Sequence, residues 1–165
     1  QPVTINNGMP MRAWYDIKGM AIADKQDAEG IRDSAAEIEQ LIAREAERGV
    51  APESIVIAGF SQGGAIALHT GVRHADRLAG IMGLSTYLPL ADSLATEASD
   101  ANRATPVLMA HGSQDPVVPV QLGQASRDQL LDAGYDVAWH EYPMQHQVCM
   151  PQIATIGRWL GERLL

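Results

Sequence analysis

Hydrophobic residues recur along this chain with two different periods. Between residues 24 and 48, apolar side chains return at helical spacing with acidic and basic residues on the other face, and Gly49 suits the end of a helix. Residues 54–58 form instead a short apolar run rich in β-branched side chains, which is typical of a buried strand. The pattern therefore predicts an amphipathic helix that covers a sheet, followed by a strand of that sheet.

The same alternation continues to the end of the chain. Further strands are predicted at 78–84 and 107–111, with a fourth near an edge of the sheet at 135–141. Helices are predicted at 62–73, 119–131 and 151–164, and a short helix at 92–98 inside the loop region 86–105. Strands that alternate with helices in this way indicate an α/β domain with a mainly parallel sheet and flanking helices.

The first 20 residues follow a different pattern. Residues 2–5 and 11–15 flank the triplet Asn6-Asn7-Gly8, and an Asn-Gly pair supplies the positive φ angles of a tight turn. We expect a small hairpin that is peripheral to the main sheet, followed by a connector at 16–23. The length suits one domain, so residues 1–165 are predicted to form a single unit.

Composition and charge exclude several classes of function. The net charge of -8 argues against nucleic acid as a partner, because such a partner requires a basic surface. No run of residues approaches the roughly 18 to 20 apolar residues of a membrane span, so stable membrane insertion is not expected. The single cysteine, Cys149, excludes an intrachain disulfide and fits a cytoplasmic location.

The turn after the strand at 54–58 carries the most specific chemistry. Residues Gly59-Phe60-Ser61-Gln62-Gly63 fit a pattern in which the serine sits on a strained strand-to-helix turn that exposes its Oγ. We expect a Cβ at Gly59 or Gly63 to strike the neighbouring strand or helix. The helix that begins at Gln62 would direct free N–H groups to the place where an oxyanion develops. Glycine-rich turns also bind phosphates, but no Lys-Ser or Lys-Thr pair follows these glycines, as a phosphate loop requires.

A serine hydroxyl needs a base to remove its proton and an acid to orient that base. Reactive groups of such sheets gather at the carboxyl ends of the strands. Asp115 lies four residues past the strand at 107–111, and His146 lies just beyond the strand at 135–141. The order Ser61, Asp115, His146 along the chain is the order that α/β-hydrolases use. The sequence therefore predicts Ser61 as nucleophile, His146 as base and Asp115 as acid.

Other titratable side chains fit these roles less well. The competing residues are His69, His74, His111, His140, Asp132, Asp136 and Glu141. We interpret His69 and His74 as packing or surface residues, and we expect His111 to hydrogen-bond the loop that follows its strand. We interpret Asp132 and Asp136, at the opposite edge of the sheet, as solvated surface charges. The histidines and Cys149 show no metal-ligand spacing, so neither a metal site nor a cofactor is predicted.

Several stretches resemble one protein family. Residues 59–64, 111–119, 142–146 and 11–16 are similar to the bacterial carboxylesterase, lysophospholipase and acyl-protein thioesterase family of α/β-hydrolases, and the resemblance covers essentially the whole chain. It implies an α/β-hydrolase fold, the same Ser61, Asp115 and His146 triad, and the backbone N–H of Gln62 as one oxyanion donor. It also implies small-molecule substrates, namely short- to medium-chain carboxylic esters, lysophospholipids or acyl thioesters.

The chain departs from the family pattern at two places. Gln145 stands where the family has glycine, and if that position needs a positive φ, the glutamine introduces about 1 to 3 kcal/mol of strain. Family members also carry several strands and a His-Gly loop with a second oxyanion donor, all ahead of the region that this chain resembles. We therefore expect an N-terminally truncated form of the fold, either part of a longer protein or a naturally short one. An apolar sheet edge beside 55–58 would then be free to pair with another copy.

The leading prediction is a serine carboxylesterase that forms an acyl-enzyme on Ser61. Five residues are predicted to line its acyl pocket, although ordinary core packing explains each equally well: Trp14, Leu84, Tyr87, Leu88 and Met144. The alternative is a catalytically impaired relative that acts as a binding or self-assembly module. This alternative is considered because residues 1–165 do not include the oxyanion loop of the family.

Overall fold

A parallel sheet of four strands organises the computed structural model, which describes residues 3–18 and 26–165. The strands are β1 (Val56–Phe60), β2 (Gly80–Leu84), β3 (Val107–Gly112) and β4 (Val137–Tyr142). They lie in the order β1-β2-β3-β4, and each neighbouring pair is parallel. The four predicted strands and the parallel sheet are confirmed, with strand limits that shift by up to two residues.

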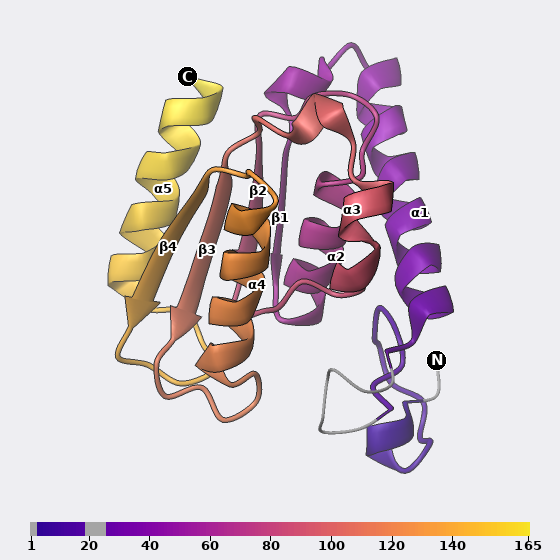
Figure 1. Ribbon diagram of the computed structural model, residues 1–165, viewed down its shortest axis with the longest axis vertical. Coiled ribbons are helices and arrows are strands. Elements are labelled where there is room, and N and C mark those ends of the chain that lie inside the picture. Colours follow the sequence, from indigo (N-terminus) through magenta and orange to yellow (C-terminus); the bar gives the residue numbers. More distant parts are fainter. Residues whose placement is uncertain (1–2, 19–25) are drawn as a thin grey trace.

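Helices cover both faces of the sheet (Figure 1). They are α1 (Ala28–Glu47), α2 (Gln62–Gly71), α3 (Leu94–Glu97), α4 (Val120–Asp132) and α5 (Met150–Leu164). Among the described residues, no helix is both long enough and apolar enough to cross a membrane. The predicted helices are confirmed, while residues 24 and 25 of the first predicted helix lie outside the described part of the chain.

Successive residues of each strand supply two separate cores. Ile81 of β2 and Met109 of β3 are buried in the larger core, which includes Leu68 of α2. Their neighbours along the strands point to the opposite face, where Met82 and Leu108 form a smaller cluster beneath α5. Because both faces are buried, the strands are continuous apolar runs instead of alternating ones.

The loop between β2 and β3 is fixed by a buried amide. Asn102 is fully buried, and its Nδ2 donates to the carbonyl oxygens of His74 and Asp76. Its Oδ1 accepts from the Leu78 N–H at 2.9 Å and from the Thr105 hydroxyl at 2.8 Å. The predicted short helix in this loop is present as η3 (Ala91–Ser93) followed directly by α3.

The predicted N-terminal hairpin is absent from the described residues. Thr4–Asn6 forms a 3-10 helix, although Asn7 and Gly8 do have the expected positive φ angles of 54° and 72°. The backbone N–H and the hydroxyl of Thr4 both donate to the carboxylate of Asp16, at 2.6 and 2.5 Å. A charged acceptor therefore holds the turn against the segment that follows the predicted second strand. The predicted connector at 16–23 lies largely outside the described residues.

Two histidines, one in α2 and one just after it, are buried. His69 of α2 is 3% exposed, and desolvation, assisted by the nearby charge of Arg73, lowers its pKa to about 4. His74, which the sequence places in a surface turn, is instead buried, with its Nδ1 at 2.7 Å from Oε2 of Glu39. Its carbonyl is also held by the buried amide described above, which explains why this turn packs inward.

We predict that His69 makes the stability depend on pH below neutrality. Its folded pKa of about 4 lies below the unfolded value of about 6.5, so between these values the unfolded chain binds the extra proton. The free energy of unfolding should therefore fall by about 2 kcal/mol between about pH 7 and about pH 5. Urea unfolding at both pH values measures this, and His69→Gln should flatten the dependence. An unchanged slope in that variant would contradict the assignment.

Candidate active site

Three polar side chains meet at the carboxyl ends of the strands. Ser61 follows β1, Asp115 lies in the loop after β3, and His146 lies in the loop after β4. The Nε2 of His146 is 3.0 Å from the Oγ of Ser61, and its Nδ1 is 2.7 Å from Oδ2 of Asp115. The structure therefore brings the three residues named from the sequence into one continuous hydrogen-bonded chain.

The backbone of Ser61 is strained. Its φ of 54° and ψ of -122° lie in a backbone region that residues other than glycine rarely adopt. Helix α2 begins at the next residue. The Ser61 N–H donates to the carbonyl oxygen of Leu84 at 2.9 Å, and the Ser61 carbonyl accepts from the Thr86 hydroxyl at 2.7 Å. Contacts from the end of β2 thus hold the serine in the conformation expected of a strand-to-helix nucleophile turn.

The steric role of the glycines differs from the prediction at one position. A Cβ on Gly59 would overlap the backbone carbon and oxygen of Gly63, so that residue must be glycine, as expected. A Cβ on Gly63 would meet only Nε1 of Trp14, at an ordinary 3.5 Å. The second close approach occurs at Gly64, whose Cβ would lie 2.8 Å from Thr86 and 2.9 Å from the Gly59 oxygen. The expectation for Gly63 is therefore wrong, and the adjacent glycine carries that constraint.

Asp115 is held as a charged acceptor by its own loop. Burial alone would raise the pKa of Asp115, but hydrogen bonds from His146 and from the N–H groups of Val118 and Val117 outweigh it and lower the pKa. The two backbone groups donate to Oδ1 at 2.9 and 2.8 Å, which leaves Oδ2 for His146. The buried Nε2 of His111 hydrogen-bonds the Val118 carbonyl at 2.8 Å, as expected for that histidine.

The loop that carries His146 fits closely against the end of β3. A Cβ on Gly112 would overlap the carbonyl oxygens of Met144 and Gln145. Gln145 is not among the described residues with a positive φ, so the strain considered for this position does not arise. The ring of Phe60 lies 4.7 Å from that of His146, centroid to centroid, and covers one side of the imidazole.

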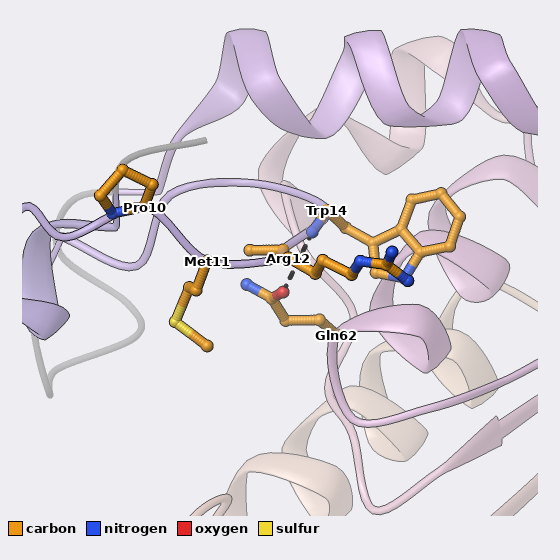
Figure 2. A pocket seen from close by; sticks show the side chains of 6 residues that line it. Pro10, Met11, Arg12, Trp14 and Gln62 are labelled. Atoms are coloured by element: carbon orange, nitrogen blue, oxygen red, sulfur yellow. Dashed lines mark hydrogen bonds between the residues drawn. The ribbon is translucent and has the colours of Figure 1, made fainter.

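Gln62 contributes both its backbone and its side chain. Its N–H is the first of α2, and N–H groups at a helix start have no acceptor within the helix. Its side-chain Oε1 accepts from the Trp14 N–H at 3.2 Å, and its Nε2 donates to the Tyr15 carbonyl at 3.0 Å. Figure 2 shows the first of these bonds. The sequence pattern predicts a role only for the backbone of Gln62, and no local signal indicates these side-chain contacts.

Among the hollows that the described residues line, two include Gln62. A cavity of about 260 Å³ is lined by Ile5, Tyr15, Ile17, Ser61, Gln62, Tyr87 and residues 116–119. A more open groove of about 710 Å³ is lined by residues 10–14 together with Gln62 (Figure 2). Only the smaller cavity includes Ser61 in its lining, so it is the one that adjoins the nucleophile turn.

Of the five predicted pocket residues, the structure places only Tyr87 in the lining of the cavity at Ser61. Trp14 lines the outer groove and is 43% exposed. Leu84 packs beneath α5, Leu88 is buried in the larger core, and Met144 is buried in the loop before His146. The sequence does not predict Ile5, Tyr15 and Ile17 as lining residues, because no sequence period relates the first 20 residues to the nucleophile turn.

The described residues contain no group of three His, Cys, Asp or Glu side chains placed to hold a metal ion.

Comparisons with known proteins identify the family of this chain. Residues 1–162 match the model of the phospholipase/carboxylesterase family. The chain belongs to that family. The fold is accordingly that of an α/β-hydrolase, which confirms the resemblance noted from the sequence.

Family relatives match nearly all of this chain but extend beyond it. Acyl-protein thioesterase 1 of Gibberella zeae is 40% identical over 99% of this chain and 73% of the relative, and that of Neurospora crassa is 42% identical over 99% and 70%. Among solved structures, Arabidopsis thaliana SOBER1 has a TM-score of 0.94 with 29% identity, over 99% of this chain and 80% of its own. Zea mays acyl-protein thioesterase 2 has a TM-score of 0.86 with 29% identity, over 99% and 78%.

Substitutions at Gly59 and Gly63 test the close approach of the strand to the helix through the free energy of unfolding. We predict that Gly59→Ala lowers the free energy of unfolding by about 3 kcal/mol or more, because the new methyl group overlaps backbone atoms that cannot rotate away. Gly63→Ala, whose methyl group has room, should change that energy by less than about 1 kcal/mol. Denaturant unfolding measures both variants. Equal destabilisation of the two would contradict the close approach at Gly59.

Proposed function

We propose that the chain is a serine carboxylesterase that works through an acyl-enzyme on Ser61. The observation that carries this proposal is the hydrogen-bonded chain from the Ser61 Oγ through both ring nitrogens of His146 to Asp115. The strained backbone of the serine and the helix start beside it provide the setting that such a nucleophile requires.

The geometry supports an ordered transfer of one proton. As the Ser61 Oγ attacks the ester carbonyl, the Nε2 of His146 accepts the hydroxyl proton across 3.0 Å. Asp115, whose pKa is lowered, stays ionised and stabilises the imidazolium through its 2.7 Å contact with Nδ1. The imidazolium then gives the proton to the departing alcohol, which leaves the acyl group on Ser61. A water molecule then attacks the acyl carbon while His146 accepts its proton, and that proton returns to the Ser61 Oγ as the carboxylic acid is released.

The negative charge of the tetrahedral intermediate needs a donor close to Ser61. The Ser61 N–H is already engaged by the Leu84 carbonyl, whereas the Gln62 N–H begins α2. The partial positive charge of the helix start adds to that donor. We therefore assign the Gln62 N–H as one oxyanion donor.

The cavity beside Ser61 defines the proposed acyl site. Its described lining is mainly apolar or aromatic, and the Tyr15 and Tyr87 hydroxyl groups hydrogen-bond to each other at 2.7 Å within it. A volume of about 260 Å³ lies just below the range of roughly 300 to 1,000 Å³ that is typical of ligand sites, which suits short- to medium-chain acyl groups. Lysophospholipids and acyl thioesters remain within the proposed class, because the same attack on a carbonyl carbon cleaves them. The expected cytoplasmic location is part of this proposal.

We predict that a fluorophosphonate labels Ser61 covalently. The reaction needs His146 as base, so His146→Ala should lower the labelling rate by about 10³-fold or more. His140→Ala, which removes an exposed histidine from β4, is the matched control and should label at the rate of the unmodified chain. Mass spectrometry of the labelled peptide gives the site.

The absence of any labelling of folded protein would overturn this function and favour the alternative, a binding or self-assembly module. That alternative draws support from the sheet, because within the described residues β1 pairs with β2 alone and Phe60 at its end is 37% exposed. Light scattering separates the two, since a single monomeric species would contradict self-assembly.

We also predict a stepwise dependence on acyl length. Each methylene buried in the cavity contributes about 0.8 kcal/mol, so kcat/KM for nitrophenyl esters should rise about fourfold per carbon until the cavity is full. Ile5→Trp should shift the plateau to shorter chains, because Ile5 lines the cavity and is 48% exposed. Leu41→Trp on α1, at 49% exposure, is the matched control and should leave the profile unchanged. A flat profile would contradict the assignment of the cavity.

A further inference from the structure

Gln62 stands at the junction of the two hollows. Its side chain contributes to the lining of the cavity beside Ser61 and also to that of the open groove formed by residues 10–14. In Figure 2 it points from the start of α2 toward the chain segment that crosses above it. The side chain of Gln62 and the segment that it contacts therefore lie between the two hollows.

The side chain of Gln62 makes two complementary hydrogen bonds with adjacent backbone groups. Trp14 offers a backbone N–H and Tyr15 offers a carbonyl, and the single amide group of Gln62 accepts from the first and donates to the second. A side chain of this length must carry both an acceptor and a donor to satisfy the two groups together, and only the amide of glutamine does so. A methionine could fill the space but would satisfy neither group.

The segment held in this way supplies a wall of the acyl cavity. The Tyr15 side chain is 3% exposed, lines the cavity and packs on Ile31 and Ala65. Its backbone carbonyl, in contrast, accepts from the side chain of Gln62, and the neighbouring Trp14 is 43% exposed. The carbonyl of Trp14 accepts from the Ser34 hydroxyl of α1. Gln62 is thus a hydrogen-bonded link from this segment to the nucleophile turn.

We propose that the Gln62 side chain is a positioning residue that fixes the Trp14–Tyr15 backbone against the turn and so sets the distance between the cavity wall and Ser61. This inference rests on the proposed ester hydrolysis at Ser61. The backbone N–H of the same residue is the assigned oxyanion donor, so one residue links acyl binding to the reacting carbonyl.

The effect of this link falls on binding more than on chemistry. An acyl chain is buried equally in the bound ester and in the transition state, and the loss of such uniform binding raises KM while kcat changes little. A distorted oxyanion donor would instead lower kcat for every ester, whatever its acyl length. The two roles of the side chain are therefore separable by kinetics.

The test compares octanoate and acetate esters in Gln62→Met. Two lost hydrogen bonds should raise KM for the octanoate ester about tenfold, with kcat changed by about twofold at most. The acetate ester, which barely enters the cavity, should lose about twofold in kcat/KM. Gln121→Met, an exposed glutamine in the first turn of α4, is the matched control for the substitution itself. Equal losses in kcat for both esters, or no loss for either, would overturn the proposal.

A binding measurement separates this proposal from the proposed function. In a chain that carries Ser61→Ala, titration calorimetry with octanoate reports the cavity without turnover, and adding Gln62→Met should weaken binding about tenfold. If the unmodified chain hydrolyses no ester but this weakening occurs, the esterase assignment fails and the positioning role stands. Unchanged octanoate affinity, or no octanoate binding by the Ser61→Ala chain, would overturn the positioning role.

Discussion

The close approach of β1 to the first turn of α2 is the constraint on which the site depends. A Cβ on Gly59 would overlap the backbone of Gly63, and a Cβ on Gly64 would lie 2.8 Å from Thr86 and 2.9 Å from the Gly59 carbonyl oxygen. This contact forces the chain to reverse at Ser61, whose φ of 54° is the local cost. The end of β2 then holds the reversed backbone through hydrogen bonds to the Ser61 N–H and carbonyl. The half-buried serine thus lies at the carboxyl edge of the sheet, within hydrogen-bond distance of His146.

The partners of the serine are positioned from the core outward. His111 is buried at the end of β3, stacks on Trp139 of β4, and holds the Val118 carbonyl in the loop that contains Asp115. A Cβ on Gly123 of α4 would lie 2.5 Å from the His111 ring, so the helix also approaches closely there. The carboxylate therefore reaches His146 from a loop whose backbone is fixed by buried groups.

The N-terminal segment is attached to this framework in another way. Among the described residues it is joined by polar contacts to Asp27, Gln62 and Ser34, and it pairs with no strand of the sheet. Tyr15 is its largest buried side chain, and its hydroxyl hydrogen-bonds that of Tyr87, which also lines the cavity. Acyl specificity in the proposed enzyme thus depends on a segment whose described residues contribute no strand to the sheet.

The sequence alone determined the alternation of strands and helices, because burial on both faces of a sheet and on one face of a helix imposes periods that can be read locally. It also located the turn at Ser61 and the loops of Asp115 and His146, since the carboxyl ends of parallel strands lie at one edge. Only the tertiary structure decided the cavity lining, the role of the Gln62 side chain and the burial of His74. The Gln62 contact to Trp14 spans 48 positions and the pair Tyr15 and Tyr87 spans 72. Contacts over such separations leave no period in the sequence, because their partners meet only after the sheet and its helices have packed.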